Sequence, residues 1–183
     1  MTYKKERGMG MELKIPENFF VGAAMSGPQT EGAYKTGGRL ESIWDTWSDL
    51  SISDFYNKVG SYVGNNFYEK YEDDIKLLKS LHMDSFRTSM QWSRLLTKDG
   101  KLNQEGAQFY HKVCKCAKEN QIELFMNLYH FDMPTYLFER GGWESRDVVE
   151  AYAAYARAAF REFGSEIRYW FTFNEPIVEP DQR

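Results

Sequence analysis

Short apolar runs recur along the chain and alternate with stretches of helical periodicity. The apolar runs predict β-strands at residues 19–24, 85–92, 122–131 and 167–173. Runs that are apolar on both faces are typical of parallel strands, which are covered on both sides, rather than of half-exposed strands. Because helical patterns separate the runs, the chain is predicted to form a parallel sheet with helical crossover connections.

Three helices are predicted between these strands. In the first, over residues 67–78, apolar side chains recur every three or four positions opposite a charged face. A similar spacing predicts helices over residues 109–117 and 149–163. Ser145 is the expected N-cap of the last helix, and Gly164 is its expected stop.

Two α/β architectures fit this alternation: an open doubly wound sheet and part of a (β/α)8 barrel. A dinucleotide-binding sheet needs a glycine-rich fingerprint after its first strand, whereas residues 26–32 read SGPQTEG. No P-loop lysine occurs there, so we expect no nucleotide phosphate site. The connection over residues 35–66 is unusually long and carries five aromatic residues. Such connections are often functional, although this one could equally form a small hydrophobic cluster of its own.

Composition and charge narrow the class of protein. The 42% hydrophobic and 27% charged residues are ordinary for a globular chain, and no run reaches the roughly 18–20 apolar residues that span a bilayer. A net charge of −4 argues against a nucleic-acid partner. Residues 1–14 form a polar extension without the apolar core of a secretory signal. We therefore expect a cytoplasmic location and no membrane partner.

The two cysteines suggest neither a disulfide nor a metal site. Cys114 and Cys116 lie two positions apart in a helical pattern and point to different sides of the helix. Two thiols alone do not make a zinc site, and the sequence has no H-x-x-x-H motif. We expect no metal and no cofactor.

Polar side chains follow each predicted strand. Functional residues of parallel α/β folds collect at the carboxyl ends of the strands. Amide, imidazole and carboxylate groups beside many aromatic residues are what a carbohydrate site requires. The candidates are Gln29 and Glu31 after the first strand, residues 91–94 after the second, residues 130–132 after the third and residues 174–176 after the fourth.

Each candidate alone also has a structural explanation. Glu175 follows a very apolar strand, so it is expected to be partly desolvated, which would raise its pKa and suit a general acid. A glutamate at a strand end can equally serve as a cap or an ion-pair partner. His130 can be a structural histidine. Arg87, inside an apolar strand, calls for a buried anion, either in a structural ion pair or in orienting a catalytic carboxylate.

Five motifs in a fixed order carry a family resemblance. They are FFVGAAMSGPQTEGA, SFRTSMQWSR, NLYHFDMP, GGW and TFNEP. Through them, the segment from Ile15 to Pro176 resembles the family-1 glycoside hydrolases. The resemblance implies a (β/α)8 TIM barrel and a retaining β-glycosidase. Residues 15–183 would then be the N-terminal half of a single catalytic domain, supplying about its first four strands.

The same resemblance implies roles for five residues. Glu175 in TFNEP matches the family's acid/base, and Asn174 matches the residue that meets the sugar 2-hydroxyl. Gln29 and His130 match residues that bind hydroxyls of the reacting sugar. Arg87 matches the arginine that supports the nucleophile.

Two motifs point to a substrate class. SGPQTEG and YHFDMP resemble the bacterial branch that acts on 6-phosphorylated β-glucosides, which implies a cytoplasmic 6-phospho-β-glucosidase. The alternatives are a β-glucosidase or β-galactosidase acting on unphosphorylated sugars, and a non-catalytic sugar-binding or self-associating fragment.

The nucleophile motif of the family does not occur in the sequence. A retaining glycosidase needs a second carboxylate about 5–5.5 Å from the first, and the family carries it in a T-E-N-G-like motif on a late strand. The 183 residues contain no such motif. We therefore expect the chain to be inactive alone, to need the C-terminal half of the barrel as a partner, and to self-associate.

Overall fold

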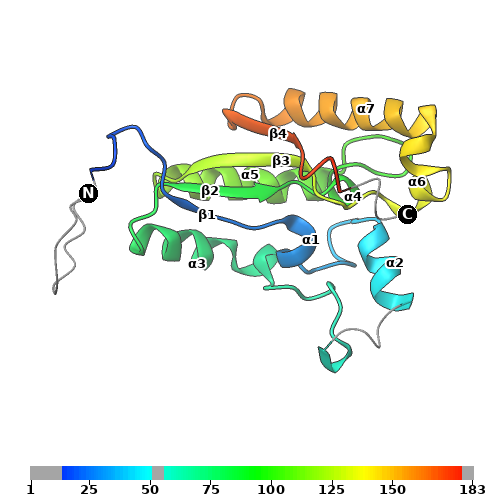
Figure 1. The fold of residues 1–183 in the computed structure, drawn as a ribbon, viewed down its shortest axis with the longest axis horizontal. Coiled ribbons are helices and arrows are strands. Elements are labelled where there is room, and N and C mark those ends of the chain that lie inside the picture. The colour runs from blue at the N-terminus through cyan, green and yellow to red at the C-terminus, as the bar shows by residue number, and fades with distance from the viewer. Residues whose placement is uncertain (1–13, 51–55, 179–183) are drawn as a thin grey trace.

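A computed structural model describes residues 14–50 and 56–178, so most of the predicted extension at residues 1–14 lies outside it. Its centre is a sheet of four parallel strands that follow one another in chain order (Figure 1). All four predicted strands are present, but each is shorter than its apolar run. They are β1 (Gly22–Ala24), β2 (Ser85–Ser89), β3 (Glu123–Tyr129) and β4 (Tyr169–Phe173).

The strand order decides between the two architectures. A doubly wound sheet contains a point at which the strand order reverses. The order β1-β2-β3-β4 has no such reversal within the described residues. Parallel strands added one after another, each pair joined through a helix, form the wall of a (β/α)8 barrel.

Three long helices make the crossover connections: α3 (Phe67–Ser80), α5 (Gln104–Glu119) and α7 (Arg146–Phe163). Each extends beyond its predicted range. Figure 1 shows α5 behind the sheet, with α3 on the side of β1 and α7 on the side of β4. Large aromatic side chains fill the space between helix and sheet, and the rings of Phe67 and Phe86 have centroids 5.8 Å apart. The core therefore lies on the helix-covered face of the sheet.

The predicted flanking residues of α7, Ser145 and Gly164, are confirmed in position, although neither acts as expected. Ser145 is the N-cap, but its hydroxyl makes no capping bond. Its carbonyl oxygen instead accepts the N–H groups of Val148 and Val149 at 3.1 and 3.2 Å. Gly164 follows the helix with φ −64°, so its freedom to adopt left-handed backbone is not used.

The long connection over residues 35–66 holds an element of its own, α2 (Ile43–Leu50). Trp44 and Trp47 within it meet edge to face at 5.2 Å. The N–H of Ile43 donates to the carbonyl of Met133 at 2.9 Å, which fixes the start of α2 beside the segment that follows β3. The remaining short elements are α1 (Gly27–Thr30), η2 (Tyr56–Lys58), α4 (Trp92–Leu95), α6 (Thr135–Phe138) and η3 (Gly142–Glu144).

A histidine between two carboxylates links α5 to α7. His111 Nδ1 lies 2.6 Å from Glu166 Oε1, and its Nε2 lies 3.0 Å from Glu162 Oε1. A neutral imidazole has one N–H, so only the imidazolium donates to both carboxylates. Burial lowers the pKa of His111, but the hydrogen bonds and charges of the two glutamates outweigh burial and raise it above its ordinary value.

We expect His111→Gln to remove a pH-dependent part of the stability. Because the folded pKa is raised, this contribution is complete below about pH 6.5 and is lost as the pH rises through the folded value. The unaltered chain should melt about 1–4 °C above the variant at pH 5.5, as for a partly exposed ion pair. The difference should shrink toward pH 9. A difference that is equal at both pH values would contradict the charged link.

Candidate active site

The predicted site residues meet at the carboxyl edge of the sheet. Gln29 lies in α1 directly beyond β1, and Arg87 lies within β2. His130 follows β3, and Asn174 and Glu175 follow β4. Since all four strands are parallel, these positions lie at or near one end of the sheet. The structure therefore places these residues at the edge of the sheet where the sequence led us to expect them.

Arg87 and Asn174 are hydrogen-bonded to each other. Arg87 Nη2 donates to Asn174 Oδ1 at 2.8 Å, and the guanidinium carbon lies 5.3 Å from the ring centroid of Phe171. The backbone N–H of Asn174 donates to the carbonyl of Tyr129 at 2.9 Å. The anion expected beside Arg87 is not among its hydrogen-bond partners in the described residues, where the half-buried guanidinium meets a neutral amide.

His130 is half-buried and neutral at pH 7. Burial, together with the positive charge of Arg87, lowers the pKa of His130 to about 4. Its Nδ1 is buried and has no hydrogen-bond partner among the described residues. An unpaired buried N–H is rarer in proteins than an unpaired acceptor. This favours the tautomer that carries its proton on Nε2, where the proton can be donated to a ligand.

Gln29 presents a fixed amide. Its side chain is exposed, and its Oε1 accepts a hydrogen bond from the buried hydroxyl of Ser26 at 2.8 Å. The Nε2 group is then left as a donor. The N–H of Gly27 donates to Ser89 Oγ at 2.7 Å, so the short turn that carries Gln29 is attached to the end of β2.

Glu175 is exposed, so the predicted partial desolvation is wrong for this chain. It follows β4, which has a hydrogen-bonded neighbour on one side only among the described strands. Little therefore covers the carboxyl group. The backbone of Glu175 is left-handed, with φ 43°. A non-glycine residue in this region is uncommon and worth attention as a sign of local constraint.

A buried ion pair supports the first two strand ends. Glu31 Oε2 accepts from Arg94 Nε at 2.8 Å and from Gln91 Nε2 at 2.7 Å. Its Oε1 accepts from the hydroxyl of Tyr110 at 2.8 Å. Both charged side chains are almost fully buried, with 0% and 1% of their surfaces exposed. Glu31 is therefore committed to structure.

A second buried pair is joined to the first through Gln91. Arg39 Nη1 lies 2.7 Å from Asp45 Oδ2, and Arg39 Nε donates to Gln91 Oε1 at 2.9 Å. Arg39 and Asp45 were missed in the sequence. The S-x-x-D spacing of Ser42 and Asp45 was a usable signal, since the N–H and hydroxyl of Ser42 both donate to Asp45 Oδ2 at 2.8 Å. No sequence pattern indicates the partner of Arg39.

The cysteines provide no nucleophile. Cys114 and Cys116 are buried, unpaired thiols in α5, and burial raises the pKa of Cys114 to about 12. Across residues 14–50 and 56–178, no three histidine, cysteine, aspartate or glutamate side chains form a possible metal-binding group. In the same part of the chain, no helix has the length and apolar character needed to cross a membrane.

Comparison with known proteins identifies the family. The sequence model of glycosyl hydrolase family 1 matches residues 11–182. The chain belongs to glycosyl hydrolase family 1. The family-1 resemblance read from the five motifs is confirmed.

Relatives within family 1 are named for two activities, 6-phospho-β-glucosidase and β-glucosidase. The 6-phospho-beta-glucosidase GmuD of Bacillus subtilis is 43% identical over 168 residues, which cover 91% of this chain and 36% of that protein. Beta-glucosidase 9 of Arabidopsis thaliana is 40% identical over 166 residues, which cover 90% of this chain and 32% of that protein. This family-1 chain therefore spans about a third of the length of the relatives that it matches.

Solved family-1 structures share the fold. The β-glucosidase of Exiguobacterium antarcticum B7 superposes with a TM-score of 0.88 at 36% identity, covering 93% of this chain and 38% of that one. A rice Os3BGlu6 β-glucosidase mutant, in a covalent complex with Glc, superposes with a TM-score of 0.86 at 35% identity, covering 92% of this chain and 35% of that one. The predicted half of a (β/α)8 barrel is confirmed.

Proposed function

We propose that this family-1 chain is the acid/base half of a retaining β-glycosidase that hydrolyses 6-phosphorylated β-glucosides. The observation that carries the proposal is the Arg87–Asn174 hydrogen bond at the carboxyl edge of the sheet, with Gln29 and neutral His130 on the same edge and Glu175 next in the chain. Several directional donors beside one carboxyl group fit a sugar with many hydroxyls.

Glu175 is the proposed acid/base. Its carboxyl group protonates the glycosidic oxygen while a carboxylate nucleophile attacks the anomeric carbon, so the C–O bond breaks as the glycosyl–enzyme ester forms. The resulting carboxylate of Glu175 then takes a proton from water, which attacks the same carbon and releases the nucleophile. The covalent complex of the rice relative with Glc supports a covalent intermediate. The nucleophile is proposed to lie outside residues 1–183, which contain no T-E-N-G-like motif.

The remaining residues are proposed to bind hydroxyls of the reacting sugar. Arg87 donates to the amide oxygen of Asn174, so the amide nitrogen of Asn174 is left to donate to a hydroxyl. Ser26 leaves Gln29 Nε2 as a donor in the same way. An exposed aromatic ring stands close by, because the guanidinium carbon of Arg87 lies 5.3 Å from the ring centroid of Phe171, which is 44% exposed. Such rings can pack against the apolar face of a sugar.

The phosphorylated substrate is supported by sequence similarity. The Bacillus subtilis relative is named as a 6-phospho-β-glucosidase at 43% identity. The β-glucosidase of Arabidopsis thaliana at 40% favours plain β-glucosides as a second candidate. Joined to the remaining part of a family-1 barrel, the chain should cleave nitrophenyl 6-phospho-β-glucoside at least about tenfold faster than the plain glucoside. The reverse preference would favour the second candidate. A phosphorylated substrate also supports the proposed cytoplasmic location.

Self-association is proposed for the chain in isolation. Phe20 and Phe171 on the face of the sheet away from the helices are 42% and 44% exposed, and Ile177 is 82% exposed. Among the described strands, β1 and β4 each have one unpaired edge. Exposed strand edges and apolar patches promote association. Sedimentation velocity should therefore show a mass that rises with concentration, whereas a monomer at all concentrations would contradict the proposal.

Truncating Gln29 or His130 to alanine should slow the reconstituted enzyme. If their hydrogen bonds strengthen in the transition state, each truncation should lower kcat/KM by about 10–100-fold, with much of the loss in kcat. A purely structural role predicts a lower Tm with near-normal kinetics. Gln108→Ala is the matched control, because Gln108 is an exposed residue of α5 outside the predicted site. It should change neither quantity.

A further inference from the structure

A fully buried carboxylate holds the turn that carries His130. Asp132 is 0% exposed. Its Oδ1 accepts the backbone N–H of His130 at 3.1 Å, and its Oδ2 accepts the backbone N–H of Trp92 at 3.0 Å. His130 follows β3, and Trp92 begins α4 just after β2. The two oxygens of Asp132 therefore tie the ends of two neighbouring strands together.

The turn formed by His130, Phe131 and Asp132 needs the support of these hydrogen bonds. Phe131 has left-handed backbone, with φ 60°, which is uncommon for a residue other than glycine. A conformation of this kind persists only where the surrounding structure holds it in place. Asp132 directly follows Phe131 and supplies this support: its carboxylate accepts the N–H of His130, which directly precedes Phe131, and the N–H of Trp92 on the neighbouring segment. Loss of either acceptor should loosen the turn.

The ring of His130 depends on its backbone for orientation. Its Nδ1 is buried without a hydrogen-bond partner among the described residues. The ring meets Phe131 edge to face, with centroids 5.5 Å apart. Because the imidazole makes no hydrogen bond to the described residues, the backbone turn fixes where the ring stands. A group that holds the turn thus also places the ring.

We propose that Asp132 is a positioning residue: by accepting the N–H groups of His130 and Trp92, it places the His130 ring at the carboxyl edge of the sheet. The importance of that placement rests on the proposed function, in which His130 binds the reacting sugar. Asp132 itself is buried and acts through His130.

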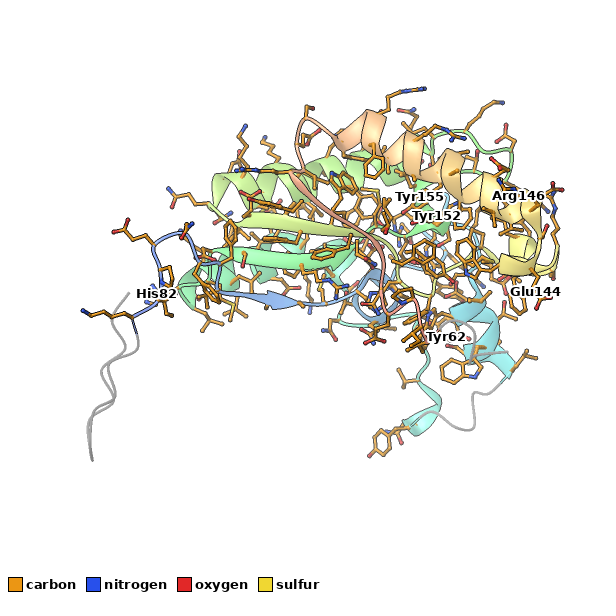
Figure 2. The ribbon with its side chains drawn as sticks, turned by 45° about the horizontal axis from the view of Figure 1, so that its top comes forward. Tyr62, His82, Glu144, Arg146, Tyr152 and Tyr155 are labelled. Atoms are coloured by element: carbon orange, nitrogen blue, oxygen red, sulfur yellow. The ribbon has the colours of Figure 1, made fainter. Side chains whose placement is uncertain are left out.

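Burial of the Asp132 carboxyl group makes these two hydrogen bonds sensitive to pH. Burial raises the pKa of Asp132 to about 7, against the lowering effect of the two backbone hydrogen bonds and of Arg39. The other titratable groups that act on it are Glu31 and, from α7, Tyr152 and Tyr155, whose positions are labelled in Figure 2. A protonated carboxyl has one oxygen that carries hydrogen and accepts poorly. The tie is therefore complete only when Asp132 is ionised.

The sign of the stability effect follows from the same shift. The folded carboxyl binds more protons than the unfolded one between about pH 4 and pH 7. The contribution of Asp132 to the free energy of unfolding therefore falls as the pH rises through this range. The ionised carboxylate that positions His130 therefore lowers the free energy of unfolding.

Asp132→Asn in the full 183-residue chain tests the proposal. The amide oxygen of the asparagine can accept one of the two N–H groups, but its NH2 group is a donor and cannot accept the other. Amide hydrogen exchange at Trp92 and His130 should speed up by at least about tenfold, and the His130 ring should titrate closer to its ordinary pKa of 6.5 than to about 4. Asp84→Asn is the matched control, because Asp84 Oδ1 accepts the N–H of Val21 at 2.7 Å at the other end of the sheet. It should leave both readouts unchanged.

Several results would overturn the proposal. One is an Asp132→Asn variant that has a lower Tm but keeps the exchange rates and the His130 titration of the unaltered chain. Asp132 would then stabilise the fold without positioning His130. If Asp132→Asn does not fold, the unaltered chain still decides. Its Trp92 and His130 amide shifts should titrate together with the Asp132 carboxyl carbon, with a midpoint near pH 7. Flat amide shifts would overturn the proposal. Failure of glucose 6-phosphate to perturb His130 would instead count against the proposed function.

Discussion

Glu175→Gln is expected to slow the hydrolysis of β-glycosides with poor leaving groups by about 10²–10⁴-fold in the reconstituted family-1 enzyme, the contribution typical of a general acid–base group. Glutamine keeps the size and hydrogen bonding of the side chain but cannot give up a proton. Nitrophenyl glycosides should be affected less in the first step, because their leaving group hardly needs protonation.

Added azide provides the sharpest check on this assignment. It should restore turnover of the Glu175→Gln enzyme on nitrophenyl substrates, because azide attacks the glycosyl–enzyme intermediate without needing a base. Glu105→Gln is the matched control, since Glu105 is an exposed residue in the first turn of α5. It should leave all rates unchanged. Equal losses for good and poor leaving groups, without azide rescue, would contradict the role of Glu175.

Arg94→Met should destabilise the chain by about 3–5 kcal/mol, the cost of removing one partner of a buried ion pair. The substitution leaves the carboxylate of Glu31 buried without its cation. It also removes the donors to the carbonyl groups of Gly32 and Thr36, at 3.1 and 3.2 Å. Urea unfolding would measure the loss as a shift in midpoint at constant slope. Against a total stability of typically 5–15 kcal/mol, the effect is large.

The same substitution at the surface provides the control. Arg146 lies 2.8 Å from Glu150 in an i,i+4 pair on α7, with 81% of its side chain exposed. Figure 2 shows Arg146 at the outer side of the fold. Arg146→Met should cost less than about 1 kcal/mol. If Arg94→Met cost no more than Arg146→Met, the buried network would not support the site as described.

The sheet was predictable because each strand lies within a short, largely apolar run between helical patterns, although only β2 and β3 are mostly buried in this chain and β1 and β4 are half-buried or exposed. The patterns also indicated the three long helices, since each packs one face against the sheet. The boundaries were less predictable. Residues 90–92 belong to the same predicted run as β2, but the strand ends at Ser89 and α4 begins at Trp92, whose N–H donates to Asp132, forty residues later. A pattern within one segment does not contain such a contact.

The site was predictable in position but not in environment. Parallel strands bring Gln29, His130 and Asn174 to one end of the sheet, so their order along the chain was sufficient to group them. The exposure of Glu175 was not predictable, because an apolar strand indicates burial of the residue that follows it only if another element covers the end of the strand. Gln91, which accepts from Arg39, and Trp92, which donates to Asp132, come from segments distant in sequence, and no local spacing indicates these two contacts.

The central proposal is that residues 1–183 carry the acid/base half of a family-1 glycosidase and that the nucleophile lies outside them. The most direct measurement mixes this chain with the separately produced remaining part of a family-1 barrel and follows nitrophenyl 6-phospho-β-glucoside cleavage. Neither chain alone should turn over this substrate, whereas the mixture should. A mixture that contains the Glu175→Gln chain should lose activity on glycosides with poor leaving groups. Robust turnover by a well-folded monomer of this chain alone would contradict the account.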